Sequence, residues 1–179
     1  MSNEHNIYGR SIYFELANEH DAEFILDLRM NNKFNQFLSQ VSNDLQDQTH
    51  WLKKYKEREK QELESYYIIK RIDNNSNIGT VRLYDFLNNP MSFCWGSWIL
   101  NEQKTPNAAI ESALLVYKIA FENKNFEQSH FDVRKENEKV ISFHRKLGAE
   151  LINEDDLNYY FIYKKETYHK ILKKYSRFI

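Results

Sequence analysis

The chain has 179 residues, of which 41% are hydrophobic and 15% aromatic, and its formal net charge is −1. This length is typical of one domain with a buried core, so we expect residues 1–179 to form a single domain. A net charge near zero creates no field that would attract nucleic acid or an anionic membrane, and neither partner is expected.

The number of cysteines and the hydropathy of the sequence allow a prediction of the cellular location. The single cysteine, Cys94, cannot form an internal disulfide, and residues 1–11 contain no apolar run of signal-peptide length. No stretch approaches the roughly 20 apolar residues of a membrane span. The six histidines show no paired spacing such as H-x-x-x-H, so no metal site is expected. The sequence therefore predicts a cytoplasmic protein without a membrane span.

The first half of the chain predicts strand, helix, helix and a β-meander. Residues 11–16 form a β-type run, and cap residues at 18–21 precede a helix that ends near Asn31. Residues 32–42 show no clean period and are assigned to a helical or irregular segment. Asn43 and Asp44 would cap a helix from Leu45 to about Glu62. Strands are predicted at 66–72, 78–86 and 91–100, with turn formers at 73–77 and 88–90.

In the second half of the chain the sequence predicts helices that alternate with single strands. A buried helix is predicted at 106–123, with Pro106 in its first turn, followed by a strand at 127–133. Asn137 would cap a helix that closes at Gly148, and a last strand follows at 157–164. The tail 167–179 is an amphipathic helix that we expect to dock on the domain. This order predicts an α+β fold in which the helix at 106–123 connects two parallel strands.

The segment from Val133 to Gly148 resembles the last motif of the GCN5-related N-acetyltransferase (GNAT) family. A strand valine, a capping asparagine at 137, a donor position at His144 and the closing glycine recur at the spacing of that motif. The pair Gly96 and Trp98 looks like the G-x-W of the ribosomal-protein and amino-sugar branches. The resemblance implies a mixed, mostly antiparallel central sheet flanked by helices, a V-shaped cofactor cleft between central strands, and acetyl-CoA as acyl donor.

Residues 104–109 stand where this family keeps a Gln/Arg-x-x-Gly-x-Gly/Ala loop. Lys104 replaces the Gln or Arg and Asn107 replaces the first glycine, whereas Ala109 fits the small last position. A helix N-terminus still offers free N–H groups and a positive dipole end to a pyrophosphate. The resemblance implies that the cofactor is bound by Trp98, Ile99, Leu100, Lys104, Asn107, Ala108, Ala109 and Asn137.

Two upstream stretches resemble the GNAT subgroup that acetylates nucleotide-linked deoxyamino sugars. One runs from Arg29 to Leu38 and the other begins at His50, and in that subgroup such stretches wall the acceptor site. If the strand at 91–100 carries a bulge, a tryptophan of that strand could also stack on an acceptor ring. The expected acceptor is a small-molecule amine, a nucleotide sugar, and a homodimer is compatible with this assignment. The expected acceptor contacts are Arg29, Asn35, His50, Trp51 and Trp95.

His144 occupies the position where the family usually has a tyrosine that protonates the departing thiolate. An imidazole has a reference pKa near 6.5 and could do this work, although the same residue on an apolar stripe could be a core histidine. His130 and Asp132 share one face of a strand and are candidate bases, each with a structural role as the alternative. Cys94 is interpreted as a buried small residue.

Three functions remain open from the sequence. The leading hypothesis is an acetyl-CoA-dependent N-acetyltransferase that acts on a nucleotide-linked deoxyamino sugar. A protein N-terminal amine is the competing acceptor, and an acidic acceptor groove would favour it. The third hypothesis is a non-catalytic binding module, in which the glycine-free loop no longer binds acetyl-CoA.

Overall fold

The computed structural model describes residues 6–179. Residues 1–5 belong to the N-terminal stretch 1–11 that was searched for a signal peptide, and they lie outside the described residues. Eight strands form one sheet in the order β1-β2-β3-β4-β5-β6-β8-β7. Every neighbouring pair is antiparallel except β5 and β6. The strands are β1 (Ile7–Tyr8), β2 (Ile12–Leu16), β3 (Ser65–Arg71), β4 (Asn77–Asn88), β5 (Met91–Leu100), β6 (Gln128–Arg134), β7 (Glu150–Glu154) and β8 (Asn158–Lys164).

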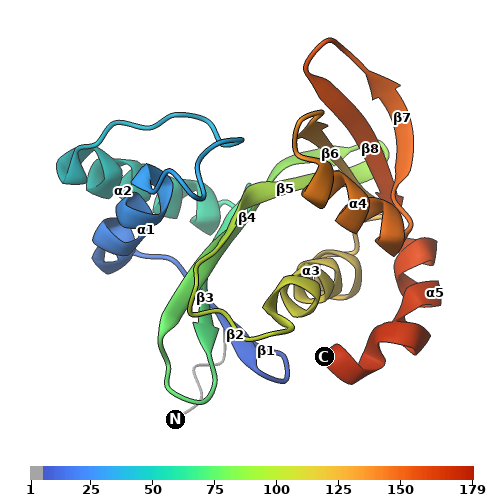
Figure 1. The fold of residues 1–179 in the computed structure, drawn as a ribbon, viewed down its shortest axis with the longest axis horizontal. Coiled ribbons are helices and arrows are strands. Elements are labelled where there is room, and N and C mark those ends of the chain that lie inside the picture. The colour runs from blue at the N-terminus through green and yellow to red at the C-terminus, as the bar shows by residue number, and fades with distance from the viewer. Residues whose placement is uncertain (1–5) are drawn as a thin grey trace.

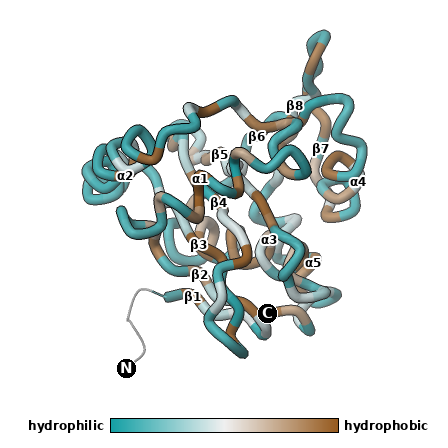
Figure 2. Tube along the Cα trace, turned by 60° about the vertical axis from the view of Figure 1, so that its left-hand side comes forward, coloured by the Kyte–Doolittle hydropathy of each residue, from teal (hydrophilic) through white to brown (hydrophobic). Residues whose placement is uncertain are grey.

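Helices cover both faces of the sheet (Figure 1). On one face lie α1 (Ala22–Met30) and α2 (Leu45–Lys60), whose apolar side chains form a small core with β3. On the other lie α3 (Ala108–Lys118), α4 (Glu138–Leu147) and α5 (Lys165–Tyr175), which share the main core. In Figure 2 the outward side of α2 is hydrophilic, as its run of charged residues predicts.

The predicted α+β fold and parallel step are confirmed. Asp44 caps α2, Asn137 caps α4, and Gly148 ends α4 in the left-handed conformation with φ 101°. The tail helix docks through Tyr168, which is fully buried. Among residues 6–179 no helix is long and apolar enough to cross a membrane.

Other predicted boundaries differ from the structure. Residues 31–44 are irregular, and α3 begins at Ala108 and continues into a π-helical turn at Ile119–Asn123. The strands β1 and β7 were not predicted. All five residues of β7 are exposed, so this edge strand has no buried face to leave an alternating pattern.

The parallel pair β5–β6 is short and then opens. Only Ser92↔Gln128 and Phe93↔Ser129 are paired, and beyond them the two strands separate. Further along β5, the register with β4 passes from Arg82↔Gly96 to Thr80↔Ile99, so an extra residue is accommodated. Ser97 lies at this β-bulge with φ 46°. The bulge that the sequence analysis considered for the strand at 91–100 is therefore present, and it lies beside the opening.

One side-chain network joins three strands at the point where β5 and β6 begin to separate. The His130 imidazole on β6 lies 2.6 Å, through Nδ1, from Ser92 Oγ on β5. Its Nε2 lies 2.9 Å from Asp85 Oδ2 on β4. We call these three side chains the vertex link. Both ring nitrogens of His130, a candidate base in the sequence, are therefore engaged in this link.

A buried carboxylate fixes the start of α3. Glu111 is 1% exposed. Its Oε1 accepts hydrogen bonds from the N–H groups of Ser11 at 2.7 Å and Ile12 at 3.1 Å, and its Oε2 accepts one from Ser11 Oγ at 2.6 Å. Ser11 Oγ is also 2.8 Å from Thr105 Oγ1. The first turn of α3 is thus tied to the β1–β2 turn.

Candidate active site

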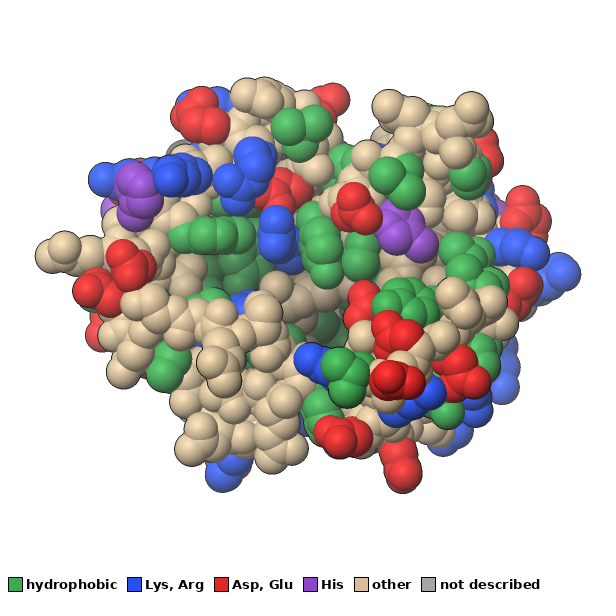
Figure 3. Space-filling view, turned by 90° about the horizontal axis from the view of Figure 1, so that it is seen from above, with side chains coloured by type: hydrophobic (Ala, Val, Ile, Leu, Met, Phe, Trp, Pro, Cys, Tyr) green, Lys and Arg blue, Asp and Glu red, His purple; other side chains and the backbone are tan. Residues whose placement is uncertain are grey.

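A cleft of about 970 Å³ opens where β5 and β6 separate. It is lined by the loop after α1, by β4, β5 and β6, by the first turns of α4 and by the turn before β8. Figure 3 shows this face from above, where hydrophobic and basic side chains alternate across its middle. The open sheet thus leaves an elongated site that reaches the surface.

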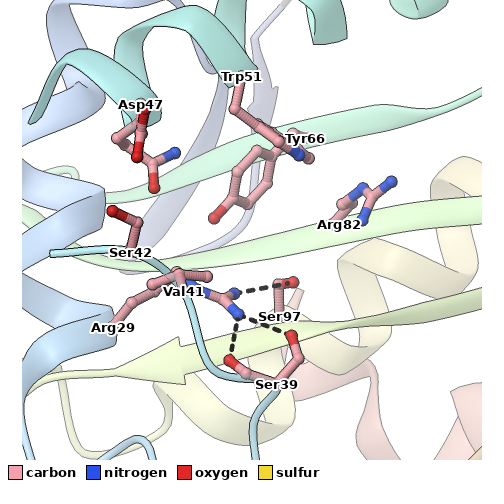
Figure 4. A pocket seen from close by; sticks show the side chains of 10 residues that line it. Arg29, Ser39, Val41, Ser42, Asp47, Trp51, Tyr66, Arg82 and Ser97 are labelled. Carbon is pink, nitrogen blue, oxygen red and sulfur yellow. Dashed lines mark hydrogen bonds between the residues drawn. The ribbon is translucent and has the colours of Figure 1, made fainter. Parts of the chain in front are cut away.

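A pocket of about 270 Å³ adjoins the cleft (Figure 4). The two cavities share four lining residues: Arg29, Ser39, Arg82 and Ser97. A ligand that reaches the bulge at Ser97 could therefore extend into the pocket. The remaining walls come from the loop after α1, from α2 and from β3: Val41, Ser42, Asp47, Gln48, Trp51 and Tyr66.

Arg29, at the C-terminal end of α1, links the pocket to the cleft. Its Nη2 donates to the Ser39 carbonyl at 2.9 Å and to Ser39 Oγ at 3.0 Å, and its Nη1 donates to Ser97 Oγ at 3.4 Å. Its Nε is buried without a hydrogen-bond partner among the described residues. A buried unpaired donor is costly, so this guanidinium is suited to an anionic or carbonyl ligand.

Arg82 on β4 also lines both the pocket and the cleft. Its Nε donates to Glu64 Oε2 at 2.7 Å, and Glu64, 3% exposed, also accepts from Arg58. The guanidinium lies 5.2 Å from the Trp51 ring centroid and 4.6 Å from that of Tyr84. A carboxylate and two aromatic rings hold its plane, while its Nη1 has no hydrogen-bond partner among residues 6–179.

His144 lies on the α4 side of the cleft and is 4% exposed. Its ring packs at centroid distances of 4.3 Å from Phe131 and 5.4 Å from Trp95, and its Nδ1 has no hydrogen-bond partner within residues 6–179. Burial lowers the pKa of His144 to about 3. The imidazole is thus neutral at pH 7 and can offer a hydrogen bond, whereas the reference pKa used in the sequence interpretation would allow an imidazolium acid.

This burial predicts how stability depends on pH. The folded-state pKa lies below the unfolded reference of about 6.5, so the unfolded chain binds a proton first and stability falls as pH drops below that value. Between pH 7 and pH 5 the wild type should lose about 2 kcal/mol more than His144→Phe, measured by urea unfolding. The exposed-site variant His169→Gln is the control and should follow the wild type. Equal losses in the wild type and His144→Phe would contradict the burial argument.

The start of α3 offers unpaired donors. The N–H groups of Ala109 and Ile110 have no hydrogen-bond acceptor among the described residues, whereas the Ala108 N–H donates to the Thr105 carbonyl at 3.1 Å. Ala108 is also fully buried, so its side chain packs in the core under the first turn of α3. Asn107 and Lys104 are exposed beside these donors. The arrangement fits a phosphate group, since free N–H groups and a helix dipole favour an anion.

The structure brings together some of the residues singled out by the sequence. Arg29, Trp95, Trp98, Asn137 and His144 line the cleft, and Trp51 lines the pocket. Trp95 is 6% exposed and packs on Tyr117 and Phe131, so little of its side chain is open to the cleft. The other members line neither cavity: Ile99, Leu100, Lys104, Asn107, Ala108, Ala109, Asn35 and His50.

Several lining residues were not singled out from the sequence. Arg82 and Tyr84 alternate with the buried Val81 and Leu83 along β4. This period of two can be read in the sequence and would have placed Arg82 and Tyr84 on the polar face of the strand. Tyr66, in a continuous apolar run, left no such signal. Among residues 6–179 no group of three or more His, Cys, Asp or Glu side chains could hold a metal ion.

Comparison with known proteins gives a consistent assignment. Residues 12–150 match the family model described as an acetyltransferase (GNAT) domain. A search of curated proteins found no match. Among solved structures, apo FdhC, described as a nucleotide-linked sugar GNAT, is 53% identical over 97% of each chain, with a TM-score of 0.91.

More distant structures share the fold. A ribosomal-protein-S5-alanine acetyltransferase from Vibrio fischeri has a TM-score of 0.77 at 16% identity, covering 90% of this chain and 97% of the other. A spermidine N-acetyltransferase variant from Vibrio cholerae has a TM-score of 0.71 at 13% identity, covering 88% and 96%. The family model spans most of the sequence and includes the opening between β5 and β6. The chain belongs to the GNAT family of acetyltransferases.

Proposed function

We propose that the protein uses acetyl-CoA to acetylate the primary amine of a nucleotide-linked deoxyamino sugar, with residues 1–179 acting as one catalytic domain. The observation that carries the proposal is the pocket that joins the cleft at Ser97, with Arg29 and Arg82 at the junction. The 53% identity to a nucleotide-linked sugar GNAT supports the same acceptor class.

The acyl donor would supply an activated thioester. Its phosphates fit the N–H groups of Ala109 and Ile110, with Lys104 close by in sequence, and its pantetheine arm fits the opening between β5 and β6. Trp98 and Asn137 line that opening. The neutral His144 would orient the thioester end through a hydrogen bond from its imidazole.

The acceptor would enter from the other face of the sheet. Two arginines flank the junction of pocket and cleft, and the guanidinium geometry suits a diphosphate. The Trp51 ring adds an aromatic wall on which a sugar or base could pack. A nucleotide sugar carries an anionic diphosphate that these arginines would attract, whereas a peptide N-terminus offers no such group, so the geometry favours the nucleotide sugar. The cytoplasmic location and the formation of a homodimer stay predictions from the sequence.

The proposal is tested by following thiol release from acetyl-CoA with UDP-linked and dTDP-linked amino-deoxyhexoses, polyamines and short peptides as acceptors. Arg29→Ala should lower kcat/KM for the active nucleotide sugar about 30-fold, the size expected for a lost charge-assisted contact, with acetyl-CoA affinity within twofold. Lys54→Ala, which removes an exposed cation of α2, is the control and should match the wild type. Turnover of polyamines or peptides alone would overturn the acceptor assignment.

A further inference from the structure

Asp132 lies on β6 three residues beyond the last pair that this strand makes with β5. Its neighbours Phe131 and Val133 are buried in the main core, so alternation places the Asp132 carboxylate on the opposite face of the sheet. Asp132 is exposed and lines the cleft. It therefore stands at the edge of the opening, on the face from which the acceptor would enter.

Other charged and titratable groups line the cleft with this carboxylate or pair with its strand. Tyr84 and Arg82 come from β4, Cys94 from β5, and Arg134 follows on β6. On β8, Tyr160 is paired with Asp132. Two residues before Asp132, His130 is held in the vertex link. Asp132 thus faces a mixed polar surface that is open to solvent.

The other groups of the cleft are poor proton acceptors or are already engaged. Burial first, and then the charge of Asp132, raises the pKa of Cys94 to about 11. Burial likewise raises the pKa of Tyr84 well above its usual value. Both groups stay protonated at neutral pH. His144 lies on the α4 side, against Phe131 and Trp95. The two other cleft carboxylates, Glu136 and Asp156, belong to the turns before α4 and β8.

We propose that Asp132 is the proton acceptor of the transfer reaction, an assignment that rests on the proposed function. A primary amine arrives as an ammonium ion and loses two protons on becoming an amide. Asp132 takes the first, directly or through one water, and frees the nitrogen lone pair. The C–N bond then forms, the C–S bond breaks, and the second proton leaves on the released thiol.

The test compares Asp132→Asn with Asp27→Asn, which removes the same charge from an exposed position of α1 that lines neither cavity. At pH 7 Asp132→Asn should lower kcat about 100-fold, within the range measured for lost general bases. Its deficit should shrink towards pH 9.5, because more of the amine arrives neutral, and added formate should restore part of the activity. Asp27→Asn should stay within threefold of the wild type. Acceptor affinity without acyl donor, measured by calorimetry, should change less than threefold in both variants.

Three results would overturn the assignment: full activity in Asp132→Asn at pH 7, a deficit that is the same at every pH, or an equal deficit in Asp27→Asn. The kinetics are measured with whichever amine the wild-type protein acetylates best, including polyamines and peptides. Failure of the amino-sugar acceptor assignment therefore leaves the Asp132 test intact. Because Asp132 is exposed, a melting temperature equal to that of the wild type is expected and separates lost chemistry from lost folding.

Discussion

Gly79→Ala is expected to lower the free energy of unfolding by about 4 kcal/mol, or to prevent folding altogether. A Cβ at position 79 would lie 2.1 Å from the Ile99 carbonyl oxygen and 3.1 Å from its carbonyl carbon. These are backbone atoms of β5, so relief requires the two strands to move apart beside the bulge. Urea unfolding followed by tryptophan fluorescence would measure the loss.

Gly96→Ala is the matched control. A Cβ at position 96 would meet the Tyr84 hydroxyl oxygen at 3.0 Å, which is the far end of a side chain that can move aside. Its stability should therefore fall by about 1 kcal/mol or less. A Gly79→Ala protein as stable as Gly96→Ala would show that the two strands do not approach as closely as described.

Glu111→Ala should cost about 3 kcal/mol, because three hydrogen bonds to one buried carboxylate are lost. The Ser11 and Ile12 N–H groups would be left unpaired, and a cavity would remain beside Gly9, where a Cβ would already lie 2.4 Å from Glu111 Oε1. Because this carboxylate ties down the first turn of α3, acetyl-CoA affinity should fall as well.

The measurements are urea unfolding and calorimetry with acetyl-CoA. Glu138→Ala, which truncates an exposed glutamate in the first turn of α4, is the control and should change stability by less than 0.5 kcal/mol. Glu111→Gln keeps the volume and one acceptor oxygen, so it should lie between Glu111→Ala and the wild type. Stability of Glu111→Ala within 1 kcal/mol of the wild type would contradict the role of the carboxylate.

Local patterns predicted the elements that have caps and one buried face. Asn137 and Gly148 mark both ends of α4, and the turn formers between the central strands mark the meander. These signals come from residues adjacent in sequence. They were sufficient for the α+β fold and for the place of the parallel step.

The site was less predictable because it is assembled by tertiary contacts. Arg82 has a fixed guanidinium only because Glu64 and two aromatic rings converge on it. His144 was located by its motif, but its lowered pKa follows from burial by residues on other elements. Asp132 and His130 share a strand face in sequence, and only the hydrogen bonds of His130 distinguish them. Such differences carry no signal in a single sequence.

The vertex link has an evolutionary consequence. Its imidazole reaches from β6 to β4 across Ser92, so the position on β5 needs a short side chain and the other two need complementary polar groups. Positions 85, 92 and 130 are therefore expected to covary among related sequences. A substitution at one of them removes a hydrogen bond that constrains the other two. The place where β5 and β6 separate is thus marked by three side chains that we expect to vary together, as well as by the end of the backbone pairing.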